Sequence, residues 1–203
     1  VNGAMEVSGD LTLASKLLVP ASAQGIFGSA DGDTGIRWEG SDALAFDTGG
    51  TERMLINSAG EITAPSQPAF LARPSSEQSN ISVGSVTTVA FGTEVFDQGG
   101  DFASNTFTAP VTGRYQLNVN LRLQNIDSAA EYYYLRINTS NRTYTSTIID
   151  PDFGQDNVFL PLSVSVLADM DSSDTAYIQV NQVGGAAQTD IDPESHFSGY
   201  LAC

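Results

Sequence analysis

Hydrophobic and polar residues alternate along several runs in the C-terminal two thirds of the chain. The run GRYQLNVNLRLQ places apolar side chains on one face of a strand, at Tyr115, Leu117, Val119, Leu121 and Leu123. The run NVFLPLSVSVL does the same at Val158, Leu160, Leu162, Val164 and Val166. Successive side chains of a strand point to opposite faces, so this period of two predicts strands with one buried face.

Further runs extend this pattern. YYYLRIN puts Tyr133, Leu135 and Ile137 on one face, and TAYIQVN does so with Ala176, Ile178 and Val180. TYTSTII and HFSGYLA complete a set of eight or more strands. No run keeps the apolar spacing of an amphipathic helix beyond two turns. The chain is therefore predicted to be all-β, with a two-sheet sandwich or jelly roll over residues 65–203.

The region 1–64 follows a different pattern of short apolar phrases separated by turn residues. VSGDLTL and NSAGEIT share one order of residue types, and GIFG, GIRW, ALAF and RMLI lie between them. An isolated sheet of this size has little interior. We therefore expect an intertwined β stalk in which three copies share one core, with an ordinary small β domain as the alternative. The prolines of APSQP, residues 64–68, mark the junction.

The charge of the chain excludes several partners. It has 8 Lys and Arg against 24 Asp and Glu, a formal net charge of −16. Such a chain cannot neutralise a row of phosphates, so we expect no nucleic acid as partner. No run of about 18 apolar residues occurs, so we expect no membrane insertion. The single cysteine, Cys203, excludes a disulfide framework and a zinc cluster. Because the chain begins at Val1, we expect it to be part of a longer protein.

The phrase DTGIRWEGSDALAFDTGGTERMLINSAGEI, residues 33–62, resembles segments of phage tail fibres and related virion appendages. The shared sequence motifs are D-T-G-I, then L-A-F, then G-T-E-R-M. In many relatives a self-cleaving chaperone domain follows, but the sequence after Pro65 has another pattern. This resemblance implies a structural protein of the virion that is exposed to the extracellular medium.

The second region resembles the globular C1q head of the C1q/tumour-necrosis-factor superfamily. The blocks are PAFLA, VAFGTEVFDQGGDF, NTFTAPVTGRYQL and HFSGYLA, in that order. The third block is similar to the family signature F-x-x-P-x-x-G-x-Y at Phe107, Pro110, Gly113 and Tyr115. The resemblance implies a ten-stranded jelly roll that forms a tight homotrimer. No Gly-X-Y collagen stalk precedes it, which leaves the complement-type biology of the family open.

Catalytic patterns are weak, and we expect no enzyme. The single histidine, His196, lies in a predicted strand beside Ser195 and Ser198, without a nucleophile-elbow motif around them. We interpret it as a structural or interface residue. No phosphate-binding loop motif occurs. A tailspike that cleaves glycans with two carboxylates is the enzyme alternative, but that chemistry needs a longer groove than so small a head offers.

Acidic runs offer oxygen ligands of the kind that Ca²⁺ prefers. They contain Asp150, Asp152 and Asp156, then Asp169, Asp171 and Asp174, and finally Asp190, Asp192 and Glu194. None has the spacing of an EF-hand. No cofactor is required by the sequence, and Ca²⁺ is the one ion for which it offers ligands. Solvated acidic turns are the alternative for each run.

The strand order predicts where binding loops gather. If the chain end and the stalk junction share one pole, the loops 125–131, 150–157 and 184–194 lie at the opposite pole. DMDSSD then lies at the stalk side. The receptor-binding candidates are Asp127, Asp152, Gln155, Asp190 and Asp192 in these loops, with Tyr132, Tyr134 and Arg136 on the flank beside them. In NVFLPLSVSVL, one face of the strand points away from the core. Its residues Phe159, Ser163 and Ser165 are the candidates for a trimer axis.

These patterns favour a trimeric virion appendage, a phage tail fibre or similar fibre, whose C-terminal knob is a receptor-binding protein. Its partners would be two further copies of itself and a glycan or protein of the host cell surface. A head fibre or decoration protein, whose knob drives trimerisation without a receptor role, is the alternative. A bacterial surface adhesin with the same head is a weaker one.

Overall fold

The computed structural model describes residues 25–28, 30–40 and 42–203, and the expected repeat VSGDLTL lies outside them. The chain divides into two compact units, Val1–Pro65 and Ser66–Cys203. The described residues contain strands and turns and no helix. Accordingly, within this part of the chain there is no helix of the length and hydropathy that crossing a membrane requires. The all-β prediction is confirmed for these residues.

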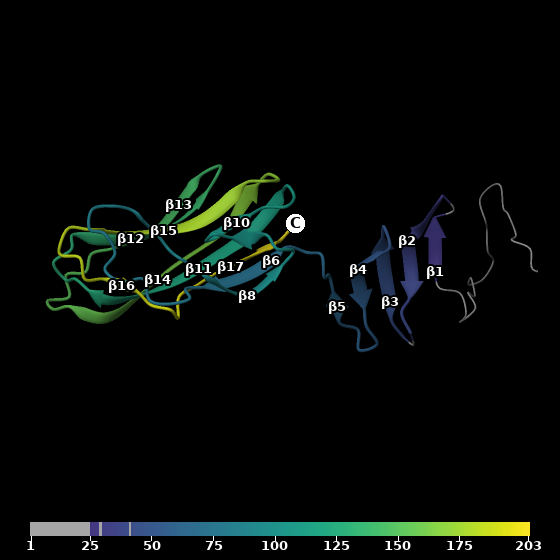
Figure 1. Cartoon of the computed structure of the whole chain (residues 1–203), viewed down its shortest axis with the longest axis horizontal. Helices are drawn as coiled ribbons and strands as arrows, with labels where there is room; N and C mark the ends of the chain where they lie inside the picture. Colours follow the sequence, from purple (N-terminus) through teal and green to yellow (C-terminus); the bar gives the residue numbers. More distant parts are fainter. Residues whose placement is uncertain (1–24, 29, 41) are drawn as a thin grey trace, which may run out of the picture. The chain divides into compact units, whose positions relative to one another are not determined.

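The first unit contains a five-stranded antiparallel sheet in sequence order, drawn in purple to blue in Figure 1. Its strands are β1 (Gly25–Gly28), β2 (Asp31–Trp38), β3 (Leu44–Thr48), β4 (Thr51–Ile56) and β5 (Ile62–Thr63). The turn between β3 and β4 is made by Gly49 and Gly50, whose positive φ angles of 56° and 67° suit a tight hairpin. Asn57 shapes the next turn, because its Oδ1 accepts from the backbone N–H groups of Ala59 and Glu61.

This sheet has almost no interior of its own. Among its described hydrophobic side chains Ala45 alone is buried, while Ile26 is 50% and Ile62 is 66% exposed. Charged contacts join its central strands, since Arg37 donates to Asp47 at 2.7 Å and to Glu52 at 3.2 Å. The hydrogen-bonded pairing runs within one chain, as successive hairpins. A core shared with other copies stays a prediction, and it is the one that fits so little burial.

The second unit, here called the knob, packs two sheets face to face (Figure 1). Sheet 1 has the order β13-β12-β15-β10-β9, and β7 also pairs with β15. Its strands are β7 (Thr87–Thr88), β9 (Phe102–Ala103), β10 (Thr106–Thr108), β12 (Tyr132–Thr139), β13 (Thr143–Ile149) and β15 (Thr175–Val183). Sheet 2 has the order β14-β11-β17-β6-β8, and β16 also pairs with β11. Its strands are β6 (Ala69–Arg73), β8 (Thr93–Gln98), β11 (Gly113–Ile126), β14 (Asn157–Met170), β16 (Asp190–Ile191) and β17 (His196–Leu201).

The predicted alternation is confirmed in β11, β12 and β15, whose inward side chains are at most 2% exposed. For strand β14 the prediction is wrong at one residue. Val158 is 65% exposed although it lies on the same face of the strand as buried Leu160. Val158 lies at the beginning of the strand, where a surface groove replaces the core. The described knob has twelve strands, three of which are segments of two residues, so the expected count of ten is not confirmed.

Aromatic rings join the two sheets in the core. Phe70 of sheet 2 stacks on Phe107 and Phe102 of sheet 1, with centroid distances of 4.8 and 5.0 Å. Phe197 of sheet 2 meets the Phe70 ring edge-on at 5.0 Å. Tyr115 is fully buried, and its hydroxyl donates to the Val111 carbonyl at 2.7 Å. The aromatic residues of the predicted family signature are therefore core residues that close one end of the sandwich.

The poles of the knob match the prediction. Strand β17 pairs with β6, and the Arg114 N–H donates to the Cys203 carbonyl at 2.7 Å, so the chain end lies beside the junction with the first unit. The turn of DMDSSD lies at the same end, since the Ser173 N–H donates to the Ala109 carbonyl. The loops after β11, β13 and β15 lie at the opposite end (Figure 1).

Close approach at the centre of sheet 2 makes Gly199 a test of core packing. An added Cβ would lie 2.7 Å from Leu117 Cδ2 and 2.7 Å from Phe70 Cε1. We expect Gly199→Ala to lower the free energy of unfolding by about 1–3 kcal/mol, measured by urea denaturation followed by circular dichroism. Gly32→Ala is the control, because an added Cβ there meets nothing within 4 Å. Equal stability of both variants would contradict this packing.

Candidate functional site

The three predicted loops meet at one end of the knob through hydrogen bonds. Asp156 joins all of them, because it accepts from the Ser128 hydroxyl at 2.7 Å and from Gln188 Nε2 at 3.1 Å. Asp127 accepts from the backbone N–H of Ala186 in the third loop. The sandwich therefore holds the loops as one connected surface, which we call the distal surface.

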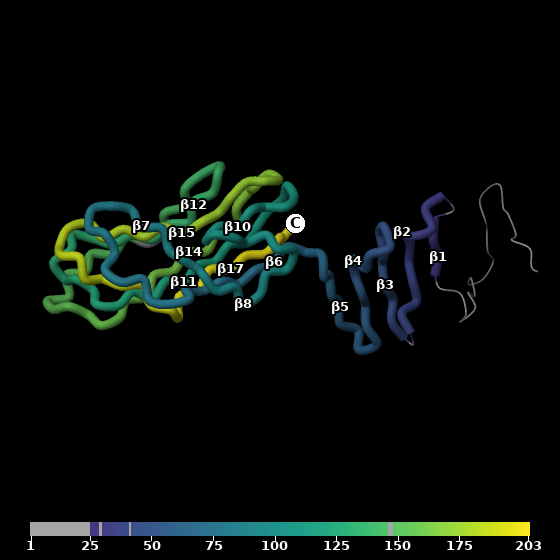
Figure 2. Tube along the Cα trace, in the orientation of Figure 1, coloured from purple at the N-terminus to yellow at the C-terminus, as the bar shows by residue number. Residues whose placement is uncertain are grey.

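A fourth segment, between β6 and β8, belongs to the distal surface and was missed in the sequence. Figure 2 shows this blue segment running from β6 to the distal end and back. There the Ile81 N–H donates to the Thr189 carbonyl at 2.8 Å, and Gln78 and Ile191 exchange two backbone hydrogen bonds. The segment carries no apolar period that could have placed it. Its partner lies more than a hundred residues along the chain, as in the contact of Asn80 with Asp190.

Three of the predicted receptor-binding residues need correction. Asp127, Asp190 and Asp192 are 5%, 6% and 5% exposed, so they present little surface to a receptor. Each carboxylate is held by donors of the knob itself, which offset the cost of burying its charge. Asp192, for example, accepts from Arg122 Nη2 at 2.6 Å and from the Glu194 N–H at 2.7 Å. We interpret them as residues that shape the distal loops.

Other candidates of the same loops are exposed. Asp152 and Gln155 lie at the surface, next to Phe153, which is 45% exposed. Asp156 is exposed as well, and its pKa is lowered because the Ser128 backbone N–H and hydroxyl, and then Gln188, donate to it. A carboxyl group with a lowered pKa keeps its negative charge at neutral pH. These side chains give the distal surface an acidic character.

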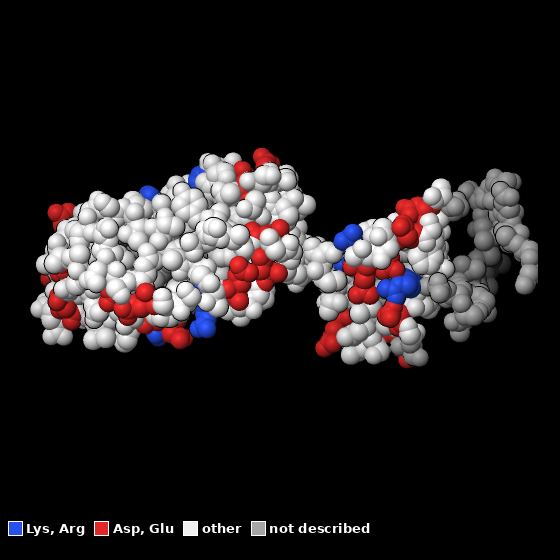
Figure 3. All heavy atoms as spheres, in the orientation of Figure 1, with Lys and Arg blue, Asp and Glu red and all other residues white. Residues whose placement is uncertain are grey.

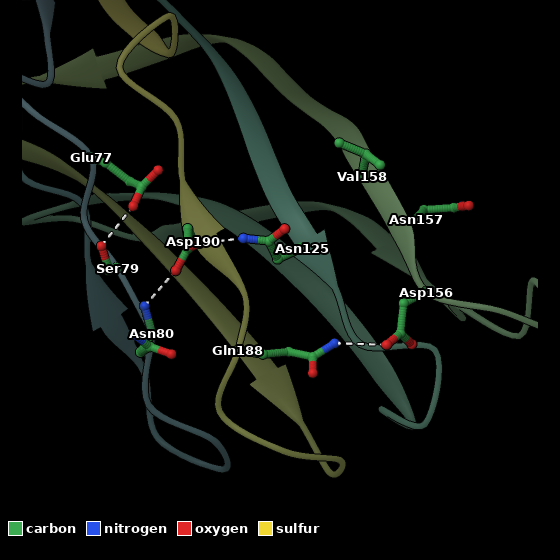
Figure 4. A pocket seen from close by; sticks show the side chains of 9 residues that line it. All are labelled: Glu77, Ser79, Asn80, Asn125, Asp156, Asn157, Val158, Gln188 and Asp190. Carbon is green, nitrogen blue, oxygen red and sulfur yellow. Dashed lines mark hydrogen bonds between the residues drawn. The ribbon is translucent and has the colours of Figure 1, made fainter.

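A groove of about 580 Å³ opens on the distal surface, between strands and loops distant in sequence. In Figure 4 the 77–80 segment forms one side, β14 the other, and the 188–190 segment lies between them. Asp190 is central, because it accepts from the Asn80 N–H at 2.7 Å and from Asn125 Nδ2 at 2.6 Å. The lining residues are Glu77, Ser79, Asn80, Asn125, Asp156, Asn157, Val158, Gln188 and Asp190.

The flank candidates form one patch on sheet 1, which we call the tyrosine patch. The rings of Tyr132 and Tyr134 stack with centroids 6.4 Å apart, and the Arg136 guanidinium lies 5.4 Å from the Tyr134 centroid. Arg136 is fixed by two hydrogen bonds to Gln179 Oε1. Ile148, 66% exposed, borders a shallow pocket with these three residues. The patch offers aromatic faces, one cation and apolar surface within a small area.

The trimer-axis candidates lie on the exposed face of sheet 2. Phe159 is 51% exposed, with the Arg122 guanidinium 5.1 Å from its centroid. Ser163 and Ser165 are exposed in the same row, and Ser165 donates to Asn118 Oδ1 at 2.8 Å. Further large hydrophobic side chains are exposed on strands of this sheet, namely Val95, Phe96, Leu167 and Tyr200. His196 is exposed on β17 and borders an apolar groove of about 490 Å³ with Phe96.

The acidic runs do not assemble into metal sites among the described residues, where no three His, Cys, Asp or Glu side chains come together. Asp169 pairs with Arg142 at 2.9 Å, while Asp174 accepts from Asn141 Nδ2 and from the Asp171 N–H. The predicted sets Asp150, Asp152 and Asp156, and Asp169, Asp171 and Asp174, therefore lack the geometry of a calcium site. Their carboxylates serve loop and turn contacts instead.

Charge on the knob is mostly acidic and unevenly spread. On the face drawn in Figure 3 the knob carries several red groups and few blue ones. The basic residues that flank the distal surface are engaged, since Arg122 pairs with Asp192 and Arg136 with Gln179. A ligand that reaches this end therefore meets a negative field in which neutral or positive groups are favoured.

Strand β17 pairs between β11 and β6 in a two-sheet jelly roll, and Phe107 and Tyr115 of the F-x-x-P-x-x-G-x-Y segment are buried in its core. These features are those of a domain of the C1q/tumour-necrosis-factor type. A model of the C1q domain matches residues 69–202, and the chain belongs to the C1q domain family. Domains of this type often form trimers.

One solved structure supports this fold. The globular domain of zebrafish complement 1qA protein is 19% identical, with a TM-score of 0.51, over 68% of this chain and 98% of that one. Murine APRIL at pH 8.5 is 13% identical, with a TM-score of 0.47, over 66% of this chain and 98% of that one. No curated protein matches the sequence. The resemblance to a C1q head is thereby confirmed, whereas the virion context of residues 33–62 stays a prediction.

The contacts of Asp190 predict a specific loss of stability. Asp190→Asn replaces one accepting oxygen by a donor that faces Asn125 Nδ2. We expect the free energy of unfolding to fall by about 1–3 kcal/mol in chemical denaturation, because a buried group then loses its partner. The matched control is Asp152→Asn in an exposed loop, with an expected change within about 0.5 kcal/mol. Equal losses for both variants would show that Asp190 does not hold the groove.

Proposed function

We propose that this chain is part of an external virion appendage, a phage tail fibre or similar fibre, and that its knob attaches the particle to the host cell surface. The observation that carries the proposal is the partly exposed tyrosine patch. Tyr132, Tyr134 and Arg136 combine aromatic faces and a cation, the side chains that dominate protein recognition surfaces. The resemblance of residues 33–62 to segments of phage tail fibres supports the virion context. The receptor is a glycan or a protein exposed on the cell.

A homotrimer is the assembly that best explains the exposed apolar surface. In sheet 2 the edge strand β14 carries Phe159 and Leu167, while the opposite edge strand β8 carries Val95 and Phe96. In a ring of three, one edge of each copy packs against the other edge of the next, so two different apolar surfaces are needed. The first unit has little interior of its own and would gain a core by packing against the first units of other copies.

Trimerisation would give the knob three equivalent patches. Each patch is small, so a single contact would be weak, but three linked contacts bind as one with far higher avidity. A tyrosine patch on sheet 1 stays accessible in such a trimer because sheet 2 supplies the contacts between copies. Attachment is then a non-covalent recognition step without chemistry at the site.

A second candidate is a head fibre or decoration protein without a receptor role. The observation that favours it is the extent of exposed apolar surface on sheet 2, which serves assembly alone. The two candidates differ in one measurable property, the binding of purified protein to host cells.

Assembly is tested by Phe159→Asp. In a trimer this change buries one carboxylate in each dry contact between copies, which is strongly unfavourable. We expect light scattering to give three times the subunit mass of 21.4 kDa for the wild type, and mainly monomer for the variant. Phe153→Asp is the control, because Phe153 is also exposed but lies in a distal loop. A wild-type protein that is monomeric at micromolar concentration would refute the trimer.

Attachment is tested by the double variant Tyr132→Ala with Tyr134→Ala. We expect adsorption of labelled protein to host cells to weaken at least about tenfold, because aromatic anchors carry much of the binding free energy at such surfaces. The matched control is Tyr177→Ala, which removes another partly exposed tyrosine from sheet 1 outside the patch. Undiminished adsorption of the double variant would refute the patch as the contact, and no adsorption of the wild type would favour the structural alternative.

A further inference from the structure

The groove on the distal surface offers hydrogen-bonding groups that the knob itself leaves free. Among the described contacts, the side-chain amides of Asn80 and Asn157 have no partner, and Gln188 uses its Nε2 but not its Oε1. Amide groups both donate and accept hydrogen bonds. Val158, 65% exposed, adds an apolar contact at the edge of the groove. Asn80 and Gln188 come from the 77–80 and 188–190 segments at the groove, whereas the Asn157 side chain points away from Asp190 and Gln188 (Figure 4).

The groove is preformed rather than assembled by a ligand. Asn80 and Asn125 have positive φ angles of 52° and 53°, a strained region for residues other than glycine that asparagine tolerates best. Buried Asp190 fixes both of them, through 2.7 and 2.6 Å hydrogen bonds to its two oxygens. Strain held in place by a buried carboxylate is typical of binding sites, because it fixes side chains before the ligand arrives.

The charges of the groove restrict what it can hold. Glu77, Asp156 and Asp190 are the ionisable lining residues, and none of the lining residues is basic. Their oxygens already accept hydrogen bonds, as when Glu77 accepts from Ser79 at 2.7 Å and Asp156 from Ser128. These carboxylates therefore add negative potential to the groove, but they offer few free oxygen atoms to a ligand. An acidic ligand is disfavoured by repulsion, and an uncharged one is not.

We propose that this groove binds an uncharged oligosaccharide, through hydrogen bonds from sugar hydroxyls to the free amide of Asn80 and to Gln188 Oε1. A hydroxyl is both donor and acceptor, like an amide, so the two groups pair in either direction. The apolar ring face of a sugar has a partner in Val158. A volume of about 580 Å³ lies within the roughly 300–1,000 Å³ of small-ligand sites and accommodates a short segment of a chain.

The inference goes beyond the proposed function, because the groove is built from other residues than the tyrosine patch. Its test uses purified full-length protein and soluble sugars, without cells. A failed titration would leave attachment through the patch untouched, and a failed adsorption assay would leave the titration untouched. Attachment through the tyrosine patch and oligosaccharide binding in the groove can therefore be refuted independently.

The experiment is a binding titration with neutral oligosaccharides of two to four hexose or N-acetylhexosamine units, and with the same chains carrying one hexuronic or sialic acid. We expect at least one neutral probe to bind, and its acidic counterpart to bind at least about tenfold more weakly. Asn80→Gly should weaken binding about fivefold or more, the usual effect of one lost hydrogen bond. Glycine is chosen at position 80 because it keeps the positive φ.

The control variant is Ser85→Ala, an exposed polar side chain of the same segment that does not line the groove. Thermal melting of each variant checks that the fold is intact. Absence of binding by every neutral probe would overturn the proposal. So would equal binding of acidic and neutral probes, or affinity unchanged in Asn80→Gly. Binding that a chelator abolishes would also overturn it, because it would indicate a metal-bridged ligand.

Discussion

Stacking of Phe70 on Phe107 is the contact on which the knob depends, because it joins sheet 2 to sheet 1 in the core. Phe197 of the last strand meets the same ring, which also ties the C-terminal strand into this cluster. With the inner faces committed to one another, every strand has just one face left for assembly or recognition. The two free faces differ in chemistry. Sheet 2 exposes aliphatic and aromatic side chains at its two edge strands, and sheet 1 exposes the tyrosine patch.

Most of the knob's fold was predictable, because strands buried on one face leave a period of two in the sequence. Leu117, Leu135 and Ile178 lie in the core as that period requires. The exception is Val158, which is exposed although it lies on the core-facing side of its strand. Parity fixes which side of a sheet a residue faces, but it does not say where the opposite sheet ends. The gathering of three loops at one pole was predictable for a related reason, since antiparallel strands alternate in direction.

The site itself was predicted less well, because the environment of a carboxylate is invisible in a sequence. Asp152 and Asp190 look alike as loop residues, yet one is exposed and the other is buried between Asn80 and Asn125. The donors that bury Asp190 come from segments far away along the chain, and one of them lies in a loop without any periodic signal. Acidic runs therefore suggested calcium, whereas the folded chain uses these oxygens to tie its own loops together.

The division of tasks between faces also bears on how an acidic protein can approach a cell whose surface is itself negative. Long-range repulsion slows such an encounter, most of all at low ionic strength. The tyrosine patch carries the cation Arg136 and no carboxylate among its pocket residues, so it offers a contact that avoids the repulsion. The groove also offers contacts that do not depend on charge. Its free groups are amides, and their hydrogen bonds to hydroxyls do not require an opposite charge. Under the proposed attachment and trimerisation, the knob would recognise a surface through contacts that are neutral at short range, and symmetry instead of electrostatic attraction would multiply them.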